Sequence, residues 1–129
     1  MTKKFAQFAM LIVAAFAFTS CGKSHEDMIN EYTEHLEAGA VILNDIADDK
    51  DVDENLDALK TWVSDGNDLD AEMKEYDEEN KVPQAEADEI AEKFKDQVTK
   101  AATAYGLARA KATMGKHGAK VRDILKDMK

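Results

Sequence analysis

Residues 24–47 read SHEDMINEYTEHLEAGAVILNDIA and repeat apolar or small side chains at steps of three and four residues. These positions are Ile29, Tyr32, Leu36, Gly39, Leu43 and Ile46. Such a heptad seam, the apolar stripe of a coiled coil, lies on one face of an α-helix. Ser24 followed three residues later by Asp27 is typical of a capped helix start. The stretch therefore predicts a long amphipathic helix that packs against other helices.

A second seam continues from residue 51 to residue 80. Its positions are Val52, Leu56, Leu59, Val63, Gly66, Leu69 or Asp70, Met73 and Tyr76. Asp51, with Glu54 three residues on, is expected to cap this helix. Asp65-Gly66-Asn67 is also a turn signal, but the seam keeps its phase across it. We therefore expect one continuous helix; a turn there would instead give a four-helix arrangement.

Glycines occupy one position in each of these two seams. A glycine inside a helix costs about 1 kcal/mol relative to alanine. At Gly39 we expect either the close approach of a partner helix or a bend, and at Gly66 a weak point.

The third seam follows Pro83, a residue suited to the first turn of a helix. Its positions are Ile90, Phe94, Val98, Ala101, Tyr105, Ala108, Ala112 and Gly115. The alanines and glycine near its end permit a close helix approach. After the interruption at residues 115–118, Val121, Leu125 and Met128 indicate a short final helix.

These seams predict an all-α fold, because no alternating β-branched run is present. The expected helices span about residues 24–47, 51–80, 83–114 and 119–128. Short connections favour an up-down-up antiparallel three-helix bundle or coiled coil with a short C-terminal helix. Residues 21–129 form its single domain. Heptad seams are also satisfied between chains, so a homo-oligomer is a further possibility.

Charge divides the chain into an acidic and a basic part. Residues 22–94 hold 24 acidic and 6 basic side chains, whereas residues 95–129 hold 3 acidic and 9 basic ones. The net charge of −10 argues against nucleic-acid binding. We expect the basic third helix to lie beside the acidic second helix; the alternative is contact with an anionic surface.

Residues 1–21 combine a positive start at Lys3 and Lys4, an apolar run too short to span a membrane, and small residues before Cys21. Phe18-Thr19-Ser20-Cys21 resembles the lipobox of bacterial lipoprotein export signals. The resemblance implies that residues 1–20 are removed and that Cys21 carries diacylglycerol. Gly22 is not the Asp that retains enteric lipoproteins in the inner membrane, so the resemblance implies an outer-membrane anchor facing the periplasm. In a host with a single membrane, it implies the outer face of the plasma membrane.

The sequence contains two arrangements of metal-binding residue types. The carboxylates of Asp49, Asp51, Asp53 and Asp57 match four positions of a calcium loop. Glu54 and Lys60 stand where that loop needs Gly and a bidentate Glu, which favours a solvated connection. Glu31 and His35 lie one helical turn apart and are a second candidate pair; the alternative is a surface role for His35.

Two further resemblances concern single residues. Met28 and His117 resemble, in broad position, the haem ligands of periplasmic four-helix b-type cytochromes. A lipid anchor, heptads and a terminal Lys129 resemble the murein lipoprotein, in which that lysine is joined to peptidoglycan.

No catalytic constellation is visible, since the serines lack a nearby His–carboxylate pattern and the glycines form no phosphate-binding loop. The sequence therefore predicts a lipid-anchored envelope protein, without enzymatic activity or cofactor, that binds a protein partner or gives structural support. A haem- or metal-binding bundle and a peptidoglycan tether are the alternatives.

Overall fold

The computed structural model describes residues 24–129, and this part of the chain forms four α-helices and no strand. The predicted all-α class is confirmed. The helices are α2 (His25–Ala47), α3 (Val52–Glu79), α4 (Gln84–Met114) and α5 (Gly118–Leu125). The second seam forms one helix that continues through Gly66.

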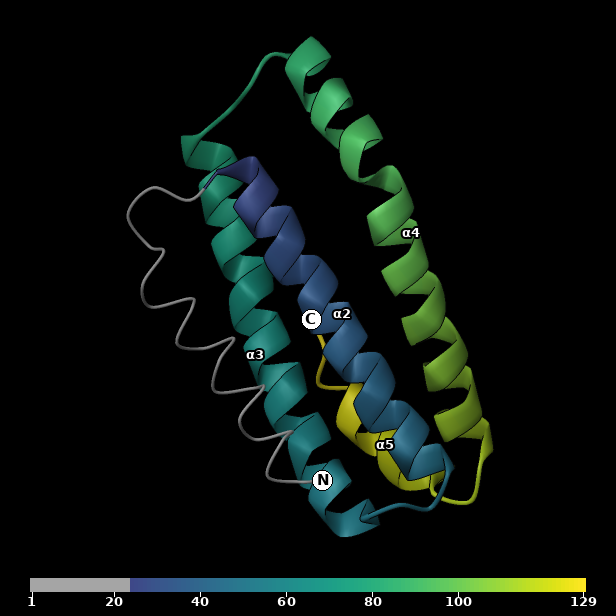
Figure 1. Ribbon diagram of the computed structural model, residues 1–129. Helices are drawn as coiled ribbons and strands as arrows, with labels where there is room; N and C mark the ends of the chain where they lie inside the picture. The colour runs from purple at the N-terminus through teal and green to yellow at the C-terminus, as the bar shows by residue number, and fades with distance from the viewer. Residues whose placement is uncertain (1–23) are drawn as a thin grey trace.

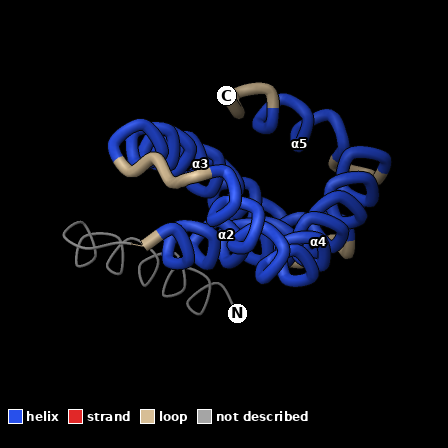
Figure 2. Tube along the Cα trace, turned by 90° about the horizontal axis from the view of Figure 1, so that it is seen from above, coloured by secondary structure: helices blue, strands red, loops and turns tan. Residues whose placement is uncertain are grey.

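Helix α2 lies between α3 and α4 (Figures 1 and 2). It packs most extensively against α4, while α5 contacts both α3 and α4. Helices α3 and α4 touch where Trp62 stacks on Tyr105, but few of their residues come close to one another. The expectation that these two oppositely charged helices pack side by side is therefore wrong. The reason is that α2 is buried on more than one side, as its buried Thr33, His35, Leu36, Ala38, Gly39 and Ala40 show.

Polar pairs show that α2 and α4 run in the same direction with a constant register. Lys93 bonds to Glu26, and Gln97 bonds to Asn30, each across 67 residues of sequence. Three alanines of α4, Ala101, Ala108 and Ala112, are buried. Because alanine is small, this stripe lets the two helix axes come close, as the sequence predicted.

The contact between α2 and α3 instead places aromatic rings on glycines. A Cβ atom at Gly39 would lie 2.5 Å from Cζ2 of Trp62, and one at Gly66 would lie 2.6 Å from Nε2 of His35. Either side chain would need to move to admit a methyl group. The close approach predicted at Gly39 is therefore present, and the glycine makes room for Trp62.

The molecule has two unlike halves. The closed half, residues 38–64 and 101–129, contains every member of the main hydrophobic core. It holds nine acidic and nine basic side chains. The acidic half, residues 24–37 and 65–100, holds 18 acidic and 5 basic side chains. The net negative charge of the described chain therefore lies entirely on the acidic half.

The helix starts differ in how they are capped. Ser24 accepts a hydrogen bond from the Asp27 backbone and donates its own N–H to the Asp27 carboxylate, which completes the predicted capping box. The cap predicted from Asp51 is wrong, because its side chain makes no capping bond and its φ is 40°. Pro83 immediately precedes α4.

Candidate functional site

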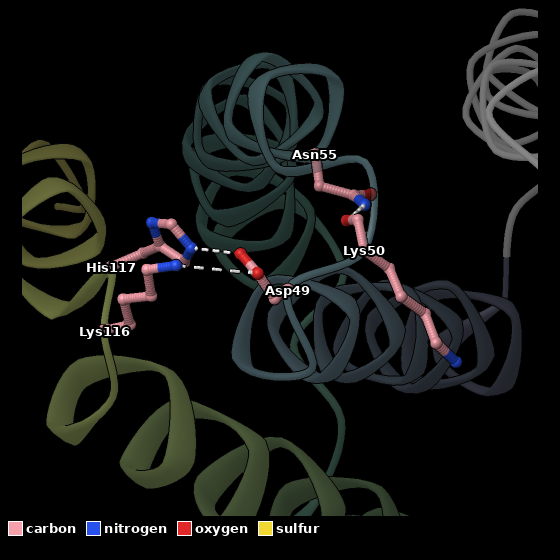
Figure 3. Close-up of polar contacts among 5 residues, drawn as sticks. All are labelled: Asp49, Lys50, Asn55, Lys116 and His117. Atoms are coloured by element: carbon pink, nitrogen blue, oxygen red, sulfur yellow. Dashed lines mark hydrogen bonds and ion pairs between the residues drawn. The ribbon is translucent and has the colours of Figure 1, made fainter.

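At the end of the closed half, the α2–α3 connection meets the turn between α4 and α5 (Figure 3). Asp49 and Asp51 have φ of 60° and 40°, a left-handed backbone that is uncommon outside glycine. Between them, the carbonyl of Lys50 accepts a hydrogen bond of 2.8 Å from the buried Asn55 side chain. This bond fixes the tight connection before α3, although it satisfies a carbonyl and not the free N–H groups that an Asp51 cap would have bound.

Asp49 joins this connection to the α4–α5 turn. Its Oδ1 lies 2.7 Å from Nε2 of His117, and its Oδ2 lies 3.7 Å from Nζ of Lys116 (Figure 3). The hydrogen bond from His117 is the main reason that the pKa of Asp49 is lowered, and the Lys116 charge adds to it. The His117 side chain is only 17% exposed, so the bond is shielded on the imidazole side.

A carboxylate that orients an imidazole is one part of many general-base sites. The remaining parts are a nucleophile and a place for substrate. Among residues 24–129, no hydroxyl group bonds to His117. Ser24 caps α2 in the acidic half, and Ser64 is exposed on α3. The geometry therefore supports a structural role, in which the hydrogen bond between Asp49 and His117 holds the α2–α3 connection against the α4–α5 turn.

The four aspartates of the calcium-loop pattern do not converge. Asp49 contacts His117, and Asp51 directly precedes α3 with an exposed side chain. Asp53 and Asp57 are exposed on the first turns of α3, where Asp57 lies 3.8 Å from Lys60. Within residues 24–129, no group of three His, Cys, Asp or Glu side chains is placed to hold a metal ion.

His35 lies inside the helix packing, so the surface position expected for it is wrong. Its ring stacks on Trp62 with centroids 4.4 Å apart, and Trp62 stacks in turn on Tyr105 at 5.3 Å. Trp62 Nε1 donates a 2.7 Å bond to the His35 carbonyl. Burial lowers the pKa of His35 to about 4. Glu31 lies one turn away on α2 and has its own interactions.

The candidate haem ligands are far apart. Met28 is buried in the first turn of α2, in the acidic half. His117 follows α4 at the opposite end and contacts Asp49, which follows the last turn of α2. About 20 residues of helix separate Met28 from the end of α2 where His117 lies, a distance of roughly 30 Å along the helix axis. The structure does not bring these residues together.

The C-terminal segment is attached to α3 through Asn67. Its side-chain amide donates to the Asp127 carbonyl at 3.0 Å, and its Oδ1 accepts from the Lys129 N–H at 2.9 Å. The Tyr105 hydroxyl also bonds to Met128 Sδ at 3.6 Å. This explains why Asp65-Gly66-Asn67 carries turn-forming residues inside a helix: Gly66 accommodates His35, and Asn67 binds the tail.

Cys21, the predicted lipidation site, lies outside the described residues. No helix within residues 24–129 is long and apolar enough to cross a membrane. No protein-family model, curated protein or solved structure matches this chain.

Proposed function

We propose that this protein is a lipid-anchored component of the bacterial cell envelope whose helical domain acts by protein binding or structural support, without catalysis. The observation that carries the proposal is the position of the capped start of α2. Only Gly22 and Lys23 separate Cys21 from the Ser24 capping box. A lipid on Cys21 would thus hold the folded domain close to the membrane, with no long linker.

The domain of this proposal is an up-down-up antiparallel bundle of α2, α3 and α4, closed at one end by α5 (Figure 1). The lipid would attach next to the acidic half. The closed half would therefore point away from the membrane and be available to other envelope proteins.

Mass spectrometry of the membrane-extracted protein tests the anchor. We expect an N-terminal peptide that begins at Cys21 and carries diacylglycerol. A Cys21→Ser variant should lose the lipid and leave the membrane fraction, whereas Ser20→Ala, a matched change beside it, should keep both. Recovery of unmodified full-length chain from wild-type cells would refute the anchor.

The outer-membrane location can be tested separately. Density-gradient fractionation should place the wild type with outer-membrane markers and move a Gly22→Asp variant to the inner membrane.

Crosslinking in intact envelopes tests the binding role. We expect the protein to form defined crosslinked species with other envelope proteins. If no crosslinked species formed from a crosslinker at any surface position, that result would argue against protein binding.

A further inference from the structure

The outer face of α4 carries a second heptad seam. Thr103, Leu107, Ala110 and Met114 follow one another at steps of four, three and four residues, and all four are exposed. Leu107 is 65% exposed and Met114 is 86% exposed, the two highest values among the exposed large apolar side chains. Single exposed apolar residues need no explanation, but a heptad series is the spacing that packs against another helix.

This outer seam repeats the inner one. The inner seam of α4, which contains the buried Ala101, Ala108 and Ala112 and the half-buried Tyr105, has the same steps two residues earlier. Two residues correspond to about 200° around a helix, so the seams lie on opposite sides. Gly106 borders the outer seam, and a Cβ there would meet nothing within 4 Å. Helix α4 thus has a second helix-packing face that no described helix covers.

Charge indicates what kind of helix fits this face. Lys100 stands one three-residue step before Thr103, at the start of the outer seam, and Lys111 borders the seam beside Ala110. Both are exposed and make no ion pair with any residue of the described chain. They are eleven residues apart, about 16 Å along the helix. Residues 97–122 contain six basic side chains and no acidic one. The face is therefore locally cationic on a protein of net charge −10.

We propose that the outer face of α4 binds an amphipathic helix of a partner protein, whose apolar stripe is flanked by Asp or Glu side chains. The apolar stripe covers Leu107 and Met114, and the carboxylates pair with Lys100 and Lys111. This inference rests on the proposed binding function and specifies its partner class. A second copy of the same face fits less well, because residues 97–122 would bring no carboxylate to either lysine.

Two synthetic helical peptides test the proposal. Each has about three heptads with Leu and Ala at the seam positions, and the flanking positions are all Glu in one peptide and all Lys in the other. Titration calorimetry at about 50 mM salt should show the Glu peptide binding at least about tenfold more tightly than the Lys peptide. The difference should shrink at about 0.5 M salt, because ions screen exposed charges.

Variants locate the binding face. Leu107→Glu should abolish binding of the Glu peptide, and the double variant Lys100→Glu/Lys111→Glu should reverse the peptide preference. Val41→Glu is the matched control, because Val41 is a 49% exposed apolar residue on α2 outside the seam. It should leave binding unchanged. All three changes are at exposed positions, and circular dichroism checks that each variant stays folded.

Three results would overturn the proposal. These are no saturable binding of the Glu peptide, equal binding of both peptides, and binding that survives Leu107→Glu. A dimer in sedimentation equilibrium that Leu107→Glu dissociates would also overturn it, since a second copy would then be the occupant. If the protein binds a partner but not through the outer face of α4, envelope crosslinks still form from other surface positions. If the protein binds no partner, crosslinks form from no surface position.

Discussion

The closed half and the acidic half are built from the same three long helices but are stabilised differently. All fourteen buried residues of the main core lie in the closed half, where α5 adds a fourth helix. In the acidic half, the large buried apolar side chains are Met28, Leu36, Leu69 and Phe94. Since apolar burial supplies most folding free energy, the closed half should hold the fold and the acidic half should extend from it.

Electrostatics increases this difference. The acidic half has 18 acidic against 5 basic side chains, and the closed half has nine of each. Like charges on adjacent helices repel each other and oppose compact packing. A region with few buried contacts opens locally more easily than the core of the same domain. The contrast suggests that one half serves stability and the other presents charge.

The largest expected effect is at Trp62 in the closed half. Trp62→Ala removes the stacks on His35 and Tyr105 together with the bond to the His35 carbonyl. Truncation of a buried Trp costs about 3–5 kcal/mol. Urea unfolding followed by circular dichroism should show this loss of unfolding free energy.

Trp62→Phe is the matched variant, because it keeps an aromatic ring but removes the Nε1 donor. We expect a cost of about 1–2 kcal/mol, from the lost hydrogen bond and the smaller ring. A cost below about 1 kcal/mol for Trp62→Ala would show that the closed half does not depend on this stack, and would break the contrast between the halves.

The second prediction concerns pH and the histidine at the boundary of the halves. The folded-state pKa of His35 is about 4, below its ordinary value of 6.5. Between these values the unfolded chain binds a proton that the folded chain does not, so stability decreases as pH falls from about 6.5 to 4. The full difference is about 3 kcal/mol. Urea unfolding at a series of pH values measures it.

His35→Phe provides the control, since it preserves the stacked ring and removes the titrating group. Its stability should vary less between pH 7 and 5 than that of the wild type. Asp65, next to Gly66, has a pKa raised by burial and by the Asp68 charge, so it acts in the opposite sense. The same pH slope in His35→Phe and wild type would contradict the role assigned to His35.

The sequence predicted the helices because their periodicity extends over many turns. The three seams gave the all-α class, and the unbroken phase across Gly66 correctly indicated one helix. Spacing does not reveal which helix is central, however. Charge favoured side-by-side packing of α3 and α4, but α2, which is buried on more than one side, packs against both and leaves them only a small direct contact at Trp62 and Tyr105.

The candidate site was less predictable. Asp49 and His117 belong to separate sequence patterns, because nothing in a sequence brings residues 68 positions apart together. His35 resembled a surface ligand, since its partners Trp62 and Gly66 come from another helix. The structural roles of Asn55 and Asn67 had only one sequence signal, a polar residue within the helix pattern.

A pair of glycine substitutions gives an intermediate effect. At Gly39, an added Cβ would lie 2.5 Å from Trp62, and overpacking of this kind costs about 1–3 kcal/mol. The helix-propensity gain of up to about 1 kcal/mol offsets only part of it. At Gly106 an added Cβ would meet nothing within 4 Å, so alanine there should stabilise the fold by about 0.5–1 kcal/mol. The unfolding temperature should fall for Gly39→Ala and rise for Gly106→Ala. If both substitutions raised it, Trp62 would not be in tight contact with Gly39.

The smallest effect is expected for the ion pair between Lys93 and Glu26 in the acidic half. Their charged atoms lie 3.0 Å apart, but the side chains are 63% and 47% exposed. Exposed pairs contribute about 0–1 kcal/mol, and salt weakens them. In a double-mutant cycle with Lys93→Gln and Glu26→Gln, urea unfolding should give a coupling below about 0.5 kcal/mol. A coupling above about 1 kcal/mol would mean that ion pairs hold the acidic half together, so that the halves differ in the kind of interaction and not only in the amount of buried surface.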